Sequence, residues 1–353
     1  MTIQFFWQVP TAGDGRYADA KQRIRGERSD HKPYFQPGVT DPRGRRFNYF
    51  DHLHQIAKAV ELAKFDGLQV RNDPEGDESW IVAGYLSRAT RDITVLAEFD
   101  ASRGSAVYAA KNAVSYQRFT GGRFAWQIGV ERNEQRRKQQ GDFVAQQDLD
   151  ARVEEFVTVA RNVITSTGYD FEGRFFQVLQ GGFQGPLSGQ KVPPVYLTGN
   201  TDEAYGISAR LADVHVLEAQ PVSDVQQAVA QLKTLAEQAG RPLQIGLRID
   251  VLARETEEEA IFDARRHAEQ TQHQPGLSQA GLWRGLTTSS TGAAGVLVGS
   301  FAQVQQQLAD YAAAGVSQFI LGAVPSLEEA YRVGENVLPA LRAQLGLSTR
   351  LAA

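Results

Sequence analysis

The chain alternates short apolar runs with longer amphipathic segments over most of its length. The apolar runs predict buried strands at residues 3–9, 67–70, 93–99, 123–128, 195–198, 215–217, 245–252 and 316–321. Between them, apolar residues recur every three or four positions, as on the stripe that Leu53, Ile56 and Val60 form in residues 49–64. This spacing predicts helices at residues 49–64, 80–89, 105–119, 149–165, 201–210, 222–239, 255–270 and 304–314.

About eight strand–helix repeats in one chain favour a (β/α)₈ TIM barrel over a doubly wound open sheet, although spacing alone does not show that the sheet closes. No linker interrupts the pattern, so we expect one domain over residues 1–353. Two polar segments without helical periodicity, residues 14–48 and 272–291, are interpreted as insertions. Because both follow predicted strands, they belong at the C-terminal mouth, either as lids over a site or as plain surface loops.

The last repeat is the clearest. Gly315 ends the helix of residues 304–314, and a short apolar strand follows at residues 316–321. Ser326 and Glu329 then have the spacing of a capping box, which predicts the start of the final helix.

Composition removes several classes of function. The 353 residues carry a formal net charge of −4, which gives no electrostatic case for nucleic-acid binding. The absence of cysteine excludes disulfides, thiolate metal ligands and cysteine nucleophiles, and no metal-ligand spacing of His, Asp and Glu occurs. No apolar stretch approaches the ~20 residues that span a bilayer, and no export signal is visible, so we expect a cytoplasmic protein that does not bind membranes.

A strand that ends in Gly199, followed by Asn200 and Thr201, is the best candidate binding site. The turn leads into a helix whose first N–H groups lack intrahelical partners, and Asn200 has a capping-box-like spacing to Glu203. Such helix N-termini bind anions, and late βα loops of TIM barrels often bind phosphate. An ordinary helix cap is the alternative.

Arg248 is the most informative charged residue, because it interrupts the apolar strand of residues 245–252. A charge in such a strand is costly unless it faces a polar site. At a barrel mouth, Arg248 would suit bidentate recognition of a sulfonate, carboxylate or phosphate. The alternative is an internal ion pair with Asp250 or Glu218. His215, in another short strand, could also reach the mouth.

Several short strings, in order along the chain, resemble the luciferase-like flavin monooxygenases, most closely the alkanesulfonate monooxygenases. The strings are FW at 6–7, PTAGDGRY at 10–17, DHLHQIAK at 51–58, DESWIVA at 77–83, RFTGGRF at 118–124, GLRID at 246–250, ARETEEEA at 253–260 and SLEEAYRVGE at 326–335. Each string is weak alone, but their order covers most of the chain.

The resemblance implies a two-component enzyme. A separate NAD(P)H-dependent reductase would supply reduced FMN, and the flavin would react with O₂ and oxygenate a small organic substrate. It implies that Gly199, Asn200 and Thr201 hold the FMN phosphate. Trp126 and Gly129 would border the flavin ring, with core packing as the alternative for Trp126 and for Trp7. Relatives form dimers or tetramers, so a homo-oligomer is expected.

The resemblance also suggests which residues contact the substrate, and where this chain departs from the family. Trp7, Arg248 and Val324 are the candidate substrate contacts, with Asp250 as a possible base. Asp250 stands where the family has a histidine, and Val324 where it has a tyrosine. A cysteine and an early histidine are replaced near Gly76 and at Ala12, and the loop of residues 289–295 lacks an arginine.

A further departure concerns the phosphate. A histidine and a tyrosine that contact it in the family correspond to Gln146 and Asp150 here. Asp150 would repel a phosphate unless Arg132 or Arg152 compensates it.

These departures favour a monooxygenase with a rebuilt pocket and a substrate larger or less charged than a short alkanesulfonate. Two alternatives remain open. One is a deazaflavin-dependent oxidoreductase of the same fold that transfers hydride. The other is a barrel that binds flavin without turnover.

Overall fold

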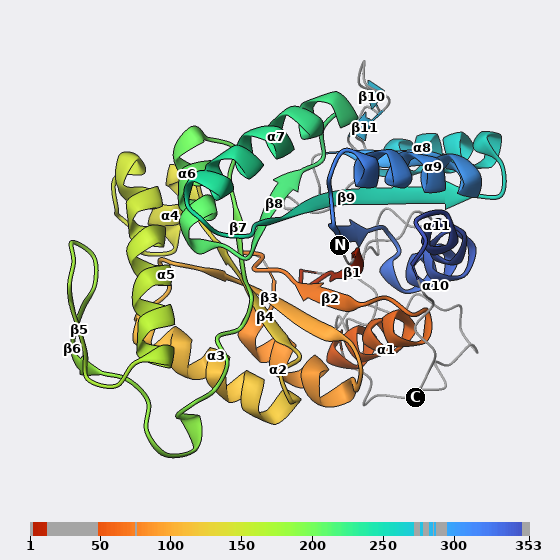
Figure 1. The fold of residues 1–353 in the computed structure, drawn as a ribbon. Coiled ribbons are helices and arrows are strands. Elements are labelled where there is room, and N and C mark those ends of the chain that lie inside the picture. The colour runs from red at the N-terminus through yellow and green to blue at the C-terminus, as the bar shows by residue number, and fades with distance from the viewer. Residues whose placement is uncertain are drawn as a thin grey trace. The chain divides into compact units, whose positions relative to one another are not determined.

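The computed structural model describes residues 3–12, 49–74, 76–271, 276–277, 282–284, 286 and 295–347. The predicted insertion at residues 14–48 and most of that at 272–291 lie outside these ranges. Parallel strands and helices alternate along the described chain (Figure 1), which confirms the predicted (β/α)₈ TIM-barrel class. The chain divides into two compact units, one made of residues 1–93, 218–227 and 247–353, and the other of residues 94–217 and 228–246.

The first unit contains both ends of the chain. Its strands are β1 (Gln4–Val9), β2 (Gly67–Val70), most of β9 (Gln244–Arg254), β12 (Val296–Ser300) and β13 (Gln318–Gly322), with two short antiparallel strands, β10 (Gly276–Leu277) and β11 (Trp283–Arg284). Its helices are α1 (Tyr49–Leu62), α2 (Ser79–Ala89), α8 (Glu257–Thr271), α9 (Phe301–Ala313), α10 (Ser326–Asn336) and α11 (Leu338–Gln344).

Strand β1 lies parallel between β2 and β13 in this unit, with Phe6 opposite Gly67 and Trp7 opposite Leu321. Phe5 stacks on Phe319 at 5.4 Å between ring centroids. Every second side chain of a strand lies on the same face. The two odd-numbered aromatic residues of β1 therefore point toward the helices, and its even-numbered residues point to the opposite face.

The second unit has four parallel strands in the order β3 (Thr94–Asp100), β4 (Phe124–Gly129), β7 (Val195–Thr198) and β8 (Val214–Glu218). Its helices are α3 (Ala106–Thr120), α4 (Glu134–Gln139), α5 (Leu149–Thr165), α6 (Asp202–Leu211) and most of α7 (Val222–Gln238). The sequence did not predict α4, nor the antiparallel hairpin of β5 (Tyr169–Glu172) and β6 (Gln177–Gly181).

One predicted helix cap is wrong and another was missed. Helix α10 begins at Ser326 after Pro325, without a side-chain cap, because the Ser326 hydroxyl instead accepts a hydrogen bond from Trp7 Nε1 at 2.9 Å. A true capping box joins Ser300 and Gln303 at the start of α9. The spacing of residues predicts a cap, but a competing partner from a distant strand decides whether it forms.

Candidate active site

Strand β7 leads into α6 through a turn that only glycine fits. Gly199 has φ of +139°, and a Cβ there would lie 2.5 Å from the Cβ of Ala204. Asn200 is exposed beside it, and α6 starts at Asp202. The end of β7 and the N-terminus of α6 therefore meet at a turn that has no room for a side chain at Gly199.

The N-cap of α6 is Thr201, not Asn200. The Thr201 hydroxyl accepts a hydrogen bond from the N–H of Ala204 at 3.1 Å. The helix starts one residue later than the Asn200–Glu203 spacing implied, because the Gly199 turn takes one more residue. Asn200 stays at the exposed rim of the turn.

Arg132 and Asp150 form an ion pair beside this turn. Arg132 Nη2 lies 2.5 Å from Asp150 Oδ1, and Nη1 lies 3.2 Å from Oδ2. The same Nη2 is 3.7 Å from the position that a Cβ on Gly199 would take. Arg132 therefore neutralises the carboxylate that seemed to oppose an anion here. The other candidate, Arg152, is buried against Asp142 at 2.8 Å.

Gln146 does not reach the turn through any contact seen here. It lies in the short 3₁₀ helix η2 (Gln146–Asp148), where its side-chain oxygen accepts a hydrogen bond from Arg137 at 3.0 Å. Gly129 does lie in this region, because it lines a narrow cavity together with Asp150, Thr198 and Ala204. The second unit thus brings the ends of β4 and β7 and the starts of α5 and α6 to one place.

His215 lies beneath the Gly199 turn rather than at an open mouth. Its ring is fully buried, with Nε2 3.1 Å from the Gly199 carbonyl oxygen and Nδ1 2.7 Å from Ser208 Oγ. The edge of Tyr205 meets the ring at 5.0 Å. Burial lowers the pKa of His215 to about 4, so the ring is neutral near pH 7.

The first unit holds a separate cluster of charges. Arg248 Nε and Nη2 donate to one carboxylate oxygen of Glu218 at 3.0 and 2.7 Å. The Arg248 side chain is 10% exposed and that of Glu218 is 47% exposed. The ion-pair alternative considered from the sequence is therefore present, with Glu218 as the partner.

Asp250 lies on the same face of β9 as Arg248, since the two are two residues apart. Its Oδ1 accepts a hydrogen bond from Gln8 Nε2 at 3.1 Å. A Cβ on Gly322 would lie 2.6 Å from Asp250 Oδ1 and 2.8 Å from Gln8 Nε2, so Gly322 makes room for this pair. Sequence reasoning missed Gln8, although a polar residue in the apolar strand β1 was a usable signal.

The two tryptophans proposed from the sequence lie on the helix-facing sides of their strands. Trp126 alternates with Phe124, which stacks on Tyr116 of α3 at 4.6 Å, and with Ile128. Its neighbour Gln127 faces the other way and donates to Glu98 at 3.4 Å. The helix-facing side of β4 therefore does not give Trp126 the flavin contact that was expected from the sequence.

Trp7 has the same orientation in the first unit. It is fully buried, packs on Phe65 at 5.3 Å and donates to Ser326. Helix packing therefore accounts for its position, and a substrate contact does not. Val324 is half-buried in the loop between β13 and α10.

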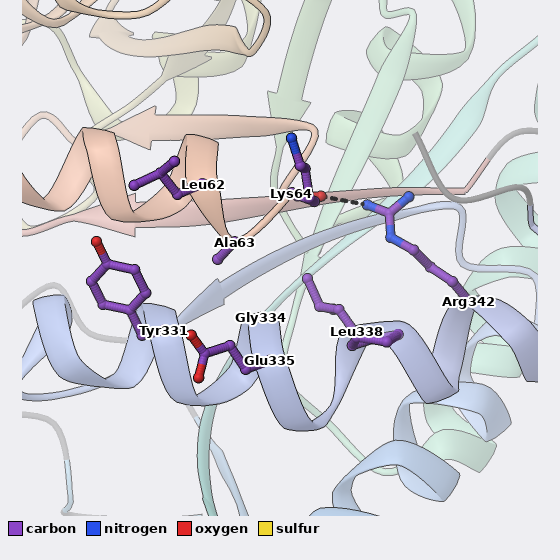
Figure 2. Close-up of a pocket in the computed structure, with 9 residues that line it drawn as sticks. Leu62, Ala63, Lys64, Tyr331, Gly334, Glu335, Leu338 and Arg342 are labelled. Atoms are coloured by element: carbon purple, nitrogen blue, oxygen red, sulfur yellow. Dashed lines mark hydrogen bonds between the residues drawn. The ribbon is translucent and has the colours of Figure 1, made fainter. Parts of the chain in front are cut away.

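A larger pocket in the first unit lies at the other end of the strands. It has a volume of about 190 Å³ and is lined by residues of α1, α10 and α11, including Leu62, Tyr331 and Arg342 (Figure 2). Lys64, whose carbonyl accepts a hydrogen bond from Arg342, precedes strand β2. Active sites of TIM barrels lie at the carboxyl ends of the strands, so this pocket belongs to the structural end of the fold.

Two classes of site are also absent from the described part of the chain. No three His, Asp or Glu side chains there are grouped to hold a metal ion. None of the described helices has both the length and the apolar character needed to cross a membrane.

Solved structures with the same fold cover nearly the whole chain. The EDTA monooxygenase from Chelativorans sp. BNC1 matches with a TM-score of 0.76 at 15% identity, covering 99% of this chain and 96% of its own. A riboflavin lyase bound to modified FMN and riboflavin also has a TM-score of 0.76 at 15% identity, covering 100% and 94%. An F420-dependent secondary alcohol dehydrogenase has 0.71 at 13% identity, covering 97% and 100%.

The family comparison goes further than this likeness of fold. The model of the luciferase-like monooxygenases matches residues 31–318, well over half of the chain. The match includes the Gly199 turn, Arg132 and the Arg248–Asp250 strand. The chain is therefore an oxidoreductase that belongs to the luciferase-like monooxygenase family.

Proposed function

We propose that this protein is a monooxygenase that uses reduced FMN and O₂ to oxygenate a small organic substrate. The observation that carries the proposal is the Gly199 turn, a glycine-only cradle between a strand end and a helix N-terminus, with the Arg132 guanidinium beside it. A structural neighbour of the same fold carries modified FMN. FMN, when bound, supplies the redox chemistry, and the protein supplies position and charge.

The residues around the turn fit a phosphate monoester. The first N–H groups of α6 and the amide of Asn200 are donors, and the positive end of the helix favours an anion. Arg132 adds a cation, and its pair with Asp150 holds the guanidinium close to Gly199. In this assignment Gly199, Asn200, Thr201 and Arg132 hold the phosphate, and Gly129 leaves room at the end of β4.

The cluster of the first unit supports a substrate class. Arg248 is already paired with Glu218, so its charge is compensated before any substrate binds. A small alkanesulfonate would meet a cation whose charge Glu218 already compensates, whereas an uncharged polar substrate needs no net positive charge at this place. We assign Arg248 to substrate binding and Asp250, held by Gln8, to proton transfer.

An anaerobic titration of the protein with reduced FMN tests the proposal. The complex is then mixed rapidly with air-saturated buffer while the flavin absorbance is recorded. We expect saturable binding and O₂-dependent reoxidation that is slower on the protein than in free solution. Absence of binding would refute the FMN assignment. A separate NAD(P)H-dependent flavin reductase would serve as partner in turnover, and size-exclusion chromatography would test the expected homo-oligomer.

A deazaflavin-dependent hydride transfer is the second candidate, favoured by the likeness of fold to an F420-dependent alcohol dehydrogenase. The same titration with reduced deazaflavin discriminates between the two. Tighter binding of the deazaflavin, with no O₂-dependent step, would favour this candidate over the oxygenase.

A further inference from the structure

The Gly199 turn rests on a buried hydrogen-bond chain that passes through His215. A carbonyl oxygen only accepts hydrogen bonds, so the His215 Nε2 that lies 3.1 Å from Gly199 O carries the proton. In a neutral ring Nδ1 is then an acceptor, and the Ser208 hydroxyl donates to it at 2.7 Å. The chain therefore runs from Ser208 through His215 to the Gly199 carbonyl with every role fixed.

This chain determines the direction of a backbone N–H group. The C=O and N–H of one trans peptide point in opposite directions. Because His215 draws the Gly199 carbonyl inward, the N–H of Asn200 points outward, to the rim of the turn. Gly199 has no side chain, and without the buried bond its φ and ψ would have a wide range.

We propose that His215 is a positioning residue for cofactor binding: by donating Nε2–H to the Gly199 carbonyl, it orients the turn so that the Asn200 N–H and the α6 N-terminus meet the phosphate of FMN. This inference rests on the proposed function, since it assigns the ligand of the turn. His215 and Ser208 are both fully buried and touch no ligand themselves. Their burial keeps the ring in its neutral form, which this arrangement requires.

Two substitutions of similar polarity separate the two hydrogen bonds. In His215→Gln the side-chain amide reaches the position of Nε2 and can still donate to Gly199 O. In His215→Asn it reaches only the position of Nδ1, and the bond to Gly199 is lost. The pair thus differs in the bond that the proposal names, while each variant keeps one neutral amide in place of the ring.

The readout is the dissociation constant of reduced FMN and of reduced riboflavin, measured anaerobically, because these two flavins differ only in the phosphate. We expect wild type to bind FMN more tightly than riboflavin. For His215→Asn, we expect FMN affinity to fall about tenfold, with riboflavin affinity changed less than about twofold, since one hydrogen bond is at stake. His215→Gln should stay near wild type. Far-UV circular dichroism and thermal unfolding check the fold of each variant.

The outcomes distinguish this inference from the proposed function. If wild type binds both flavins equally, the turn holds no phosphate, and the phosphate assignment and the role of His215 both fail. If wild type prefers FMN and His215→Asn keeps that preference, the role of His215 alone is refuted. An equal loss of both flavins in His215→Asn would also refute it, because a merely structural role gives that result. Should His215→Asn not fold, Ser208→Ala replaces it, with a smaller loss specific to FMN expected.

Discussion

The Gly199 turn of the second unit and the Arg248 cluster of the first unit are built from different chemical groups. The turn presents backbone N–H groups, fixed by a neutral buried His215, and its cation Arg132 comes with a carboxylate partner. In the Arg248 cluster, Arg248 forms an ion pair with Glu218, and Asp250 accepts a hydrogen bond from Gln8. The turn is shaped by a glycine and a strand-to-helix transition, whereas the cluster is shaped by which side chains face one another.

This difference determines which ligand groups each region could discriminate. A backbone cradle at a helix N-terminus discriminates by the presence of an anion and tolerates little change in shape. A compensated arginine contributes donors in fixed positions but little net charge. We therefore expect the two regions to bind separate ligands, so a substitution in one region should leave the other unaffected.

The largest expected effect is a loss of stability in acid that is caused by the titration of His215. Its pKa is about 4 in the folded protein and 6.5 in the unfolded chain. As the pH falls below 6.5, the unfolded chain gains a proton that the folded protein does not, so folding is disfavoured until about pH 4. At about 1.4 kcal/mol per pH unit, the free energy of unfolding falls by about 3 kcal/mol over this range. Above pH 6.5 this loss is absent.

Urea unfolding measures this loss of stability when wild type and His215→Gln are compared between about pH 7.5 and about pH 4.5. The variant lacks the ionisable ring but keeps every carboxylate. The difference between the two pH profiles of stability therefore isolates the contribution of His215. Among the carboxylates, the pKa of Asp142 is lowered by its hydrogen bond from Arg152, so it titrates at still lower pH. Identical acid slopes in the two proteins would contradict the assignment.

Removal of the arginine in the first unit should affect substrate and not cofactor. For Arg248→Ala we expect kcat/KM for the substrate to fall about 100-fold, because the variant loses the donors and leaves Glu218 uncompensated. Affinity for reduced FMN should stay within about twofold. Steady-state kinetics and the anaerobic titration provide the two numbers. Full activity of Arg248→Ala would overturn its assignment to the substrate, and Arg174→Ala, an exposed arginine paired with Asp148, is the matched control.

A methyl group at the turn should be smaller in effect but still clear. Gly199→Ala adds a Cβ that must move about 1 Å from Ala204 at a φ that side chains rarely adopt, so we expect about 2 kcal/mol of destabilisation. Chemical denaturation measures it. Gly104→Ala has φ of +85° with no atom within 4 Å of the new Cβ and isolates the backbone strain. Equal losses in both variants would show that the contact with Ala204 is harmless.

The smallest effect should come from Trp126. Its indole Nε1 is buried and has no hydrogen-bond partner among the described residues, and its side chain shares a face with Phe124. Trp126→Phe should therefore change the affinity for reduced FMN by less than about twofold and the stability by about 1 kcal/mol. A large, specific loss of flavin binding would restore the expectation drawn from the sequence and contradict the orientation of β4.

The sequence by itself determined the fold class and the local geometry of the Gly199 turn. The alternation of apolar runs and amphipathic helices has the period of a (β/α)₈ barrel, and a helix predicted at residues 149–165 coincides with α5 (Leu149–Thr165). The Gly199 turn was predictable because a strand end, a glycine and a helix start are consecutive in the chain. Local geometry follows from local sequence there.

Only the tertiary structure decided which side chains face one another. The sequence favours Trp7 and Trp126 over the neighbouring Gln8 and Gln127, because apolar residues on both faces of a buried strand hide the two-residue period. The partner of Arg248 was left open between Asp250 and Glu218, and the pairs Arg132–Asp150 and His215–Gly199 join elements that are 16 or more residues apart. Such contacts depend on strand register and helix packing, which one chain's local pattern does not encode.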